Sequence, residues 1–304
     1  MILAIDIGGT AVKMGLVDRK GHILARREAS VSFDQYQTPI LDTVKKTALE
    51  FVASQSADIE GVGVSATGQV DTALGAVVGT NGKIANYEGA QIKSVLEDTF
   101  RVPVWVLNDA NAAALGECYL GAGRGFRDVL MITLGTGVGG GLILNGQIYG
   151  GSRGFAGELG HFTLYQDGVP CACGKRGCFE CYASTTALVR RARVKDGRAL
   201  FAAVESGDEK LKSVLDAWLD DVAAGITGLV HIFNPELVLI GGGVSAQEAL
   251  LMKPLRKKVL SGVMPRFAEK LRVERAVLGN DAGMAGALKY WLDCEKGSAP
   301  KREE

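Results

Sequence analysis

The sequence predicts an α/β protein of two domains, and three observations support this prediction. The chain has 304 residues, which is more than a single core of typical size requires. Apolar runs of strand length alternate with segments of helical periodicity. A module of strand, glycine turn and returning strand occurs twice, which indicates two halves related by duplication.

The first half is expected to begin with strands, because its apolar runs are short and are separated by glycine turns. Thr38 and Pro39 are typical of a helix N-cap and first helical residue, and Ile40, Val44, Ala48 and Phe51 follow on one helical face. The expected elements are strands at residues 1–7, 11–17, 22–31, 61–65 and 102–107, with helices from residue 39 and at residues 90–100.

The second half repeats this order after a helix that opens at residues 109–111. Its first strands flank the glycines from Gly135 onward and the Asn145-Gly146 hairpin signal. The expected strands are residues 129–133, 141–144, 147–149 and 237–240, with helices between residues 181 and 237 and at residues 284–292. The charged residues 296–304 lack apolar anchors and are expected to fray.

Composition limits the classes of partner. Lys plus Arg and Asp plus Glu both total 34, so we expect neither a nucleic-acid surface nor an anionic-membrane surface. The longest apolar stretch, residues 223–244, contains His231, Asn234, Pro235 and Glu236, which are costly inside a bilayer. The first residues lack the pattern of a signal peptide, so we expect a cytoplasmic protein with small-molecule partners.

The tract Asp6-Ile7-Gly8-Gly9-Thr10 combines an acid at a strand end with glycines and a hydroxyl. Bare glycine backbone can approach a phosphate closely, and Thr10 adds a donor. These features suit a nucleotide triphosphate. The alternative for this tract alone is an ordinary Gly-Gly hairpin.

A second tract, residues 135–140, matches the GxGxxG pattern. A dinucleotide fold needs a helix directly after these glycines, whereas here a strand is expected, and the Walker A pattern is absent from the sequence. We therefore expect a nucleotide held between two glycine hairpin turns. A third tract, Gly241-Gly242-Gly243, is suited to its adenosine end.

Asn108 and Asp109 end a strand and open a helix. A helix N-terminus offers unpaired N–H donors and favours negative charge, so Asp109 is expected to stay ionised. The two interpretations are a catalytic carboxylate and a plain N-cap.

His161, Cys171, Cys173 and Cys178 supply one imidazole and three thiols in a Cys-x-Cys-x4-Cys arrangement, which suits a closed tetrahedral zinc site. A metal would order residues 168–177, whose apolar content is low. Cys181 is a spare thiol that could replace one ligand, and the alternative for the whole set is free buried cysteines.

The same metal would position Glu158, His161 and Glu180, whose carboxylates and second ring nitrogen suit sugar hydroxyls. Surface carboxylates are the alternative.

Five segments share an order and spacing: Asp6-Ile7-Gly8-Gly9-Thr10, Asn108-Asp109-Ala110-Asn111-Ala112, residues 134–141, Gly157-Glu158-Leu159-Gly160-His161, and residues 171–178 with Phe179-Glu180. Together they resemble the ROK family of repressors and sugar kinases, and the resemblance covers nearly the whole chain. It implies an actin-like, hexokinase-like ATPase fold of duplicated ribonuclease H-like domains around an interdomain cleft. The implied domains are residues 1–108, joined by a C-terminal helix at about 285–304, and residues 109–284.

The resemblance also implies residue roles. Asp109 would be the catalytic base, and His161 with the three cysteines would bind structural zinc. The sugar would contact Gly68, Asn108, Asp109, Glu158, His161 and Glu180, and ATP with Mg²⁺ would contact Asp6, Gly8, Gly9, Thr10, Lys13, Gly135, Thr136, Gly137, Gly241, Gly242 and Gly243.

The chain departs from the family pattern at Thr67, where many members have proline, and at Cys181, where a non-thiol residue is usual. Either Asn81 or Asn86 would supply a further sugar contact.

The implied activity is ATP-dependent phosphorylation of a hexose, with glucose as first choice and N-acetylmannosamine, N-acetylglucosamine, allose or a β-glucoside as alternatives. A homodimer is the family-level expectation. A sugar-responsive repressor would need a helix-turn-helix ahead of Asp6, which only five residues precede here. A non-catalytic actin-like ATPase would lack the zinc-anchored sugar loop.

Overall fold

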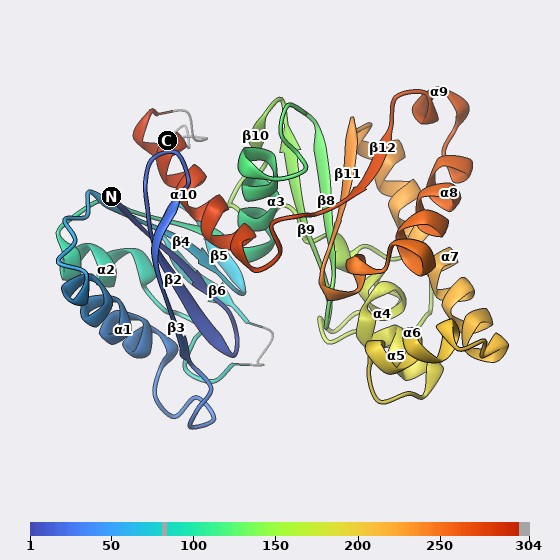
Figure 1. Cartoon of the computed structure of the whole chain (residues 1–304), viewed down its shortest axis with the longest axis horizontal. Helices are drawn as coiled ribbons and strands as arrows, with labels where there is room; N and C mark the ends of the chain where they lie inside the picture. Colours follow the sequence, from blue (N-terminus) through green and yellow to red (C-terminus); the bar gives the residue numbers. More distant parts are fainter. Residues whose placement is uncertain (81–83, 298–304) are drawn as a thin grey trace. The chain divides into compact units, whose positions relative to one another are not determined.

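The computed structural model describes residues 1–80 and 84–297 (Figure 1). The chain forms two compact units. The first comprises residues 1–124, 147–157 and 280–304, and the second comprises residues 125–146 and 158–279.

The first unit contains a five-stranded sheet with the order β3-β2-β1-β4-β7. β1 is antiparallel to β2 and parallel to β4, and β7 continues the parallel part. The strands are β1 (Ile2–Ile7), β2 (Ala11–Val17), β3 (Ile23–Ser30), β4 (Gly61–Ala66) and β7 (Val104–Asn108). A separate hairpin consists of β5 (Gln69–Asp71) and β6 (Ala76–Gly79), which we had not predicted.

Helices cover both faces of this sheet because β1 is apolar on both. Leu3, Ile5 and Ile7 pack with α1 (Ile40–Ser54) and α2 (Ile92–Phe100), while Ile2 and Ala4 pack with α10 (Ala282–Glu295). This division follows the two-residue period of a strand. Figure 1 shows α1 and α2 on one side of the sheet and α10 on the other.

α10 lies against α3 (Asp109–Leu120) and β4 at very close range, because glycines line the contact. A Cβ on Gly286 would lie 1.7 Å from the Ala112 carbonyl oxygen, and one on Gly116 would lie 2.3 Å from that of Ala282. A Cβ on Gly63 of β4 would meet the Ala287 carbonyl oxygen at 2.3 Å. The C-terminal helix therefore belongs to the first unit by backbone contact.

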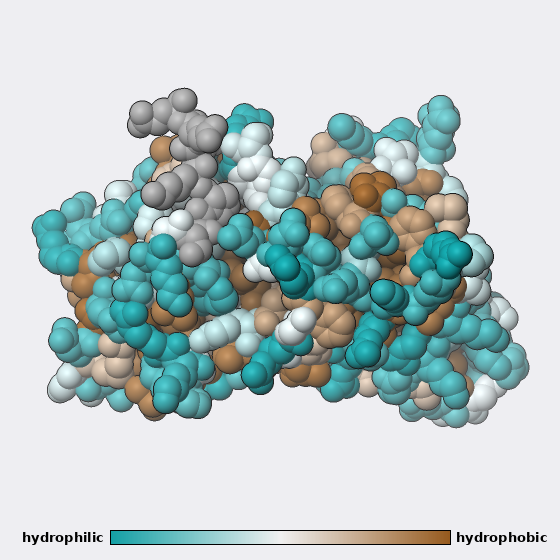
Figure 2. Space-filling view, turned by 90° about the horizontal axis from the view of Figure 1, so that it is seen from above, coloured by the Kyte–Doolittle hydropathy of each residue, from teal (hydrophilic) through white to brown (hydrophobic). Residues whose placement is uncertain are grey.

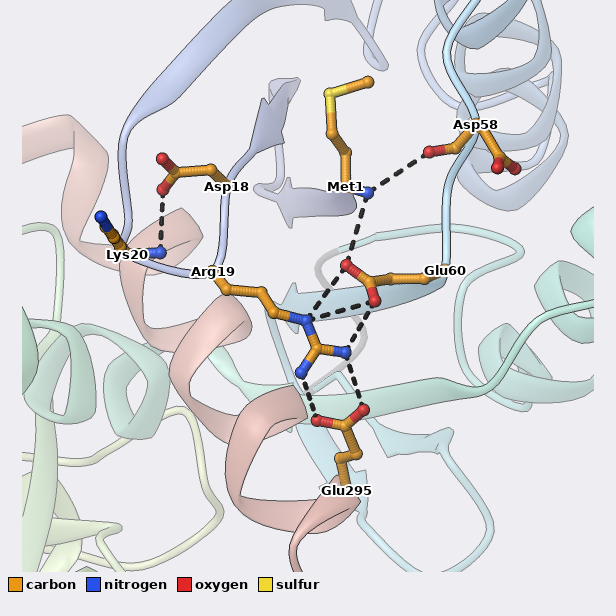
Figure 3. Close-up of polar contacts among 7 residues, drawn as sticks. All are labelled: Met1, Asp18, Arg19, Lys20, Asp58, Glu60 and Glu295. Atoms are coloured by element: carbon orange, nitrogen blue, oxygen red, sulfur yellow. Dashed lines mark hydrogen bonds and ion pairs between the residues drawn. The ribbon is translucent and has the colours of Figure 1, made fainter.

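Arg19 ties the far end of α10 to the sheet (Figure 3). Its guanidinium donates to both carboxylate oxygens of Glu60 and of Glu295, at 2.6–3.2 Å, and lies 5.4 Å from the centre of the Trp291 ring. Figure 3 shows Arg19 held between the two carboxylates. Such two-pronged pairing is the strongest form of surface ion pair.

The second sheet has the order β10-β9-β8-β11-β12, which repeats the order of the first with the same parallel and antiparallel relations. This repetition agrees with the predicted duplication. The strands are β8 (Val129–Leu134), β9 (Val138–Leu144), β10 (Gln147–Ile148), β11 (Leu237–Gly241) and β12 (Arg272–Arg275), the last of which we had not predicted.

The long helix α7 (Glu209–Phe233) supplies Trp218, Leu219, Val222 and Ile226 to the core of the second unit, where they meet Leu130 and Ile132 of β8. The remaining elements are η1 (Leu159–His161), α4 (Glu180–Ala183), α5 (Thr185–Ala192), α6 (Gly197–Glu205), η2 (Gly243–Ala246), η3 (Glu248–Met252), α8 (Lys253–Gly262) and α9 (Pro265–Ala268), with η4 (Gly279–Asp281) before α10.

One predicted helix start differs from the structure. α1 has Pro39 rather than Thr38 as its N-cap, because the Thr38 hydroxyl and N–H both donate to Asp34. Residues 109–124 group with the first unit, since α3 packs on α10. The predicted domains, 1–108 and 109–284, stay a prediction, and most of the expected tail lies outside the described residues.

Within the described part of the chain, no helix combines the length and the apolar character that crossing a bilayer requires. Figure 2 shows hydrophilic residues over much of the face it presents, with apolar residues in smaller groups. Scattered apolar residues of this kind are usual on protein surfaces.

We expect Gly286→Ala to destabilise the first unit by about 1–3 kcal/mol or more, because the added methyl group would overlap the Ala112 backbone. Gly228→Ala in α7 is the matched control. It meets nothing within 4 Å, so it should be neutral or stabilise by up to about 1 kcal/mol through helix propensity. Guanidinium denaturation of both variants measures the difference, and equal midpoints would contradict the close packing of α10 on α3.

Candidate active site

The acids predicted to act in the first unit lie at one edge of its sheet. β1, β4 and β7 are parallel, and their register aligns Ile7 with Ala66 and Ala66 with Asn108. Asp6 lies one residue before this row and Asp109 one residue after it, so both lie at this edge of the sheet, with β4 between their strands. The carboxyl ends of parallel strands are the usual place for ligands in such sheets.

The predicted first glycine turn joins β1 to β2. The Gly8 N–H donates to the Ala11 carbonyl at 3.0 Å, and a Cβ on Gly8 would press on that oxygen at 3.2 Å. The Tyr36 hydroxyl donates to the Gly9 carbonyl at 2.7 Å, and Thr10 is exposed at the tip. The Tyr36 hydroxyl and the Gly8–Ala11 hydrogen bond thus fix the turn, and its two glycines have no side chains of their own to cover the backbone.

Asp6 lies opposite Lys13 in the β1–β2 ladder and accepts a hydrogen bond from the Ser65 hydroxyl at 2.7 Å. Burial raises the pKa of Asp6, and the Ser65 hydrogen bond and the Lys13 charge offset part of this rise. A partly desolvated carboxylate is favoured in its charged form by a nearby cation.

Asn108, and not Asp109, is the N-cap of α3. Its side-chain oxygen accepts from the N–H groups of Ala110 and Asn111 at 3.0 and 3.2 Å. Its amide nitrogen donates to the Gly68 carbonyl at 2.9 Å and to Asp109 Oδ1 at 3.0 Å. The N-cap interpretation of Asp109 was therefore wrong, and Asn108 orients its carboxylate.

Gly68 meets the conditions for an obligatory glycine. Its φ is +91°, and an added Cβ would lie 2.9 Å from the Gly79 carbonyl oxygen. Because Asn108 binds its carbonyl, Gly68 forms part of the surroundings of Asp109.

Tyr87 is a residue that sequence reasoning missed. Its side chain is fully buried, and its hydroxyl has no hydrogen-bond partner among the residues that the structure describes. Burial raises the pKa of Tyr87, and the charges of Asp109 and Asp6 raise it further. One phenol thus lies within electrostatic range of both acids, and no sequence motif marked it.

The second glycine turn lies at the corresponding edge of the second sheet. The Gly135 N–H donates to the Gly137 carbonyl at 3.0 Å, and β9 begins at Val138. A strand follows the glycines as predicted, which rules out a dinucleotide-binding helix here. Thr136 is exposed at the tip, and the Thr185 N–H donates to the Gly135 carbonyl at 2.9 Å.

The third glycine tract is beside this turn, since Gly241 pairs with Thr133 at the end of β8. Gly242 has a φ of +89°, and a Cβ there would lie 2.2 Å from the Leu134 carbonyl oxygen. Gly242 and Gly243 are exposed at the junction of β11 with η2.

The predicted metal ligands come together in the second unit. One donor atom from each of His161, Cys171, Cys173 and Cys178 lies within 4.8 Å of all the others. Cys173 Sγ is 3.6 Å from Cys178 Sγ, and Cys171 Sγ is 3.7 Å from His161 Nδ1. With bonds of about 2.0–2.3 Å, a tetrahedral zinc ion separates its ligands by similar distances.

The chemistry of the cluster also fits a cation. Burial and the neighbouring thiols raise the pKa of Cys178 to about 12, so bare thiolates repel each other here. A divalent ion would relieve this repulsion. His161 Nδ1 faces the cluster, and its Nε2 lies 3.9 Å from Glu158 Oε2.

Glu158, His161 and Glu180 are brought together as predicted. Burial raises the pKa of Glu158, with His161 opposing and Glu180 adding to the effect. Glu180 Oε2 accepts from the Val138 N–H at 3.1 Å, and its Oε1 is 3.9 Å from Cys171 Sγ. Glu180 therefore links the cysteine loop to the second glycine turn, a contact that the sequence did not predict.

Gly137 makes that link possible, since a Cβ there would lie 2.0 Å from Glu180 Oε2. Phe179 anchors the base of the loop, because its buried ring stacks on Phe162 at 5.1 Å and fills the space beside Gly225 of α7.

The asparagine alternatives are settled only in part. Asn86 donates its side-chain amide to the Tyr36 carbonyl at 3.2 Å and has a φ of +57°. Asn81 lies outside the described residues. A sugar contact from either one stays a prediction.

Two sheets of identical order, each with a glycine turn between its first two strands, define an α/β protein of the actin-like, hexokinase-like ATPase class. A family model described as "ROK family" matches residues 2–294, and the chain belongs to this family.

Glucokinases from Thermotoga maritima and Halalkalibacterium halodurans are similar to this chain, at 33% and 35% identity. The first alignment covers 94% of this chain and 95% of the Thermotoga maritima protein. The second covers 95% of this chain and 94% of the Halalkalibacterium halodurans protein. A solved ROK family glucokinase from Streptomyces griseus, in complex with glucose and AMPPNP, has a TM-score of 0.81 and 33% identity. The superposition covers 95% of this chain and 98% of the Streptomyces griseus protein.

We expect the purified protein to carry about one zinc ion per chain and to lose stability when a strong chelator removes it, because residues 168–177 then lose their cross-link. Thermal unfolding with and without chelator measures the change, and added zinc should restore the original midpoint. Cleavage by a protease should appear first within residues 168–177. A metal-free protein with an unchanged midpoint would contradict the assignment of this cluster.

Proposed function

We propose that this protein is an ATP-dependent hexose kinase whose first-choice substrate is glucose, giving glucose 6-phosphate. The observation that carries the proposal is the state of Asp109. Asn108 caps α3, and the Asn108 amide and the Ala110 N–H both donate to Asp109 Oδ1, at 3.0 and 2.8 Å. These donors orient the carboxylate at the helix N-terminus, which favours its charged form. The similarity to glucokinases over 94–95% of the chain supports the same reaction.

The nucleotide would be held by backbone rather than by side chains. The turns at Gly8-Gly9-Thr10 and Gly135-Thr136-Gly137 present N–H groups and hydroxyls suited to phosphate oxygens, and Gly241-Gly242-Gly243 suits the adenosine end. We assign Mg²⁺ to Asp6, whose buried carboxylate would gain from its charge, and the Lys13 charge to the phosphates. Bound Mg²⁺ would neutralise charge on the phosphates.

The sugar would contact Glu158, His161 and Glu180 from the metal-braced loop and Gly68 and Asn108 beside Asp109. Carboxylates and an imidazole N–H form directional hydrogen bonds with hydroxyls. Metal binding through His161 Nδ1 would leave Nε2 free to donate, and its tautomer would be set by the metal. The loop would therefore select a polyol and fix its orientation.

The chemical step would be an in-line transfer. The sugar hydroxyl oxygen, most simply the one on carbon 6, bonds to the γ-phosphorus as the bond from that phosphorus to the bridging oxygen breaks, and ADP leaves. Asp109 accepts the hydroxyl proton. General-base help of this kind contributes about 10²–10⁴ to the rate, and exclusion of water would prevent ATP hydrolysis.

We expect Asp109→Asn to lower kcat by about 10²–10⁴ while glucose still binds, because the amide keeps the shape but cannot accept the proton. A coupled ADP-release assay measures turnover, and calorimetry measures glucose binding. Asp98→Asn, on the exposed surface of α2, should leave both unchanged. Near-normal turnover of the Asp109 variant would show that Asp109 is not the general base.

We expect the same assay, run over a panel of hexoses and amino sugars, to give the highest kcat/KM for glucose. A higher kcat/KM for N-acetylmannosamine or N-acetylglucosamine would support the assignment as a sugar kinase but contradict glucose as the preferred substrate. If no sugar stimulated ADP release, the assignment as a sugar kinase would be contradicted. Light scattering at the same concentration tests the homodimer expectation.

A further inference from the structure

A fourth sulfur lies beside the metal cluster. Cys181 follows Cys178 by three residues, in the first turn of α4, and its N–H donates to the Cys178 carbonyl at 2.9 Å. Its thiol lies 3.6 Å from the Pro170 carbonyl oxygen, next to Cys171 in the chain, and the Cys171 side chain contributes to its electrostatic environment. The spacing Cys178-x-x-Cys181 is one that zinc sites use repeatedly.

The cluster is asymmetric around this thiol. Cys173 and Cys178 face each other at 3.6 Å, while Cys181 approaches from the side of Cys171 and the peptide that precedes it. Cys118 and Cys294, in the first unit, take no part. Cys181 is therefore placed to replace one particular ligand.

We propose that Cys181 is a reserve ligand of this site, which binds the metal in place of Cys171 when the Cys171 bond opens. The exchange is balanced without an oxidant: the Cys181 thiol gives up its proton as its sulfur binds the metal, and the released Cys171 thiolate takes up a proton. Cys181 is partly exposed, so both protons can exchange with solvent. The donor set stays one imidazole and three thiolates, and zinc has no electronic preference that would oppose the swap.

The inference rests on the metal cluster and not on the kinase activity, so metal content tests it directly. The variants are Cys171→Ser, Cys173→Ser and the double variant Cys171→Ser with Cys181→Ser. Each full-length protein is loaded with zinc and dialysed, and zinc per chain is measured. Cys171→Ser should keep about one zinc, whereas Cys173→Ser and the double variant should lose most of it.

Cobalt substitution counts the sulfurs, because the sulfur-to-cobalt charge-transfer absorption grows with the number of thiolate ligands. Cys171→Ser loaded with Co²⁺ should match the wild-type intensity. A fall of about one third, as expected for two thiolates in place of three, would overturn the proposal. Loss of zinc from Cys171→Ser as complete as from Cys173→Ser would also overturn it, and so would zinc retained by the double variant.

A second measurement decides the case if Cys171→Ser does not fold, as circular dichroism would reveal. Excess EDTA should strip zinc from Cys181→Ser about tenfold faster than from the wild type, within the range for groups that support a metal site, because an opened Cys171 bond is no longer replaced. Cys118→Ser is the thiol control and should match the wild type. Equal release rates for Cys181→Ser and wild type would overturn the proposal.

Discussion

The second unit depends on four donor atoms that lie within 4.8 Å of one another. Three thiolates this close repel one another unless a cation lies between them, and residues 168–177 have little apolar content to hold them otherwise. The cluster fixes His161 Nδ1 inward and so directs Nε2 toward Glu158. Through Glu180 the cluster also reaches the Val138 N–H, so one metal would set the geometry of the Glu158 and Glu180 carboxylates and of a glycine turn.

The two sheets provide the frame for this arrangement. Their identical strand order places a glycine turn between the first two strands of each, and the parallel strands beside it bring the acids or further glycines to the same edge. In the first unit the frame is held by helix contacts that tolerate no side chain, at Gly116 and Gly286. Asn108 then supplies the N-cap of α3, and the Asn108 amide and the Ala110 N–H hold Asp109 Oδ1.

The sequence predicted the features that depend on local chemistry. Most strand and turn positions follow from apolar runs and glycines, and these were confirmed. The four donors chosen from cysteine spacing lie together, while their binding of a metal stays a prediction. The features it did not predict come from contacts between distant segments. The Glu180 bond to Val138 spans 42 residues, Tyr87 reaches both acids through burial, and β12 is short with one buried residue among four. Which of Asn108 and Asp109 caps α3 could not be predicted either, because both residue types are favoured at an N-cap.

The central claim is that Asp109 accepts a proton from a hexose hydroxyl. A crystal structure of the protein with glucose and a non-hydrolysable ATP analogue tests it most directly. The account predicts an Asp109 carboxylate oxygen about 2.6–3.2 Å from the hydroxyl that faces the γ-phosphorus, with Glu158, His161 and Glu180 on the other hydroxyls. A sugar bound with its reacting hydroxyl beyond hydrogen-bond reach of Asp109 would contradict it.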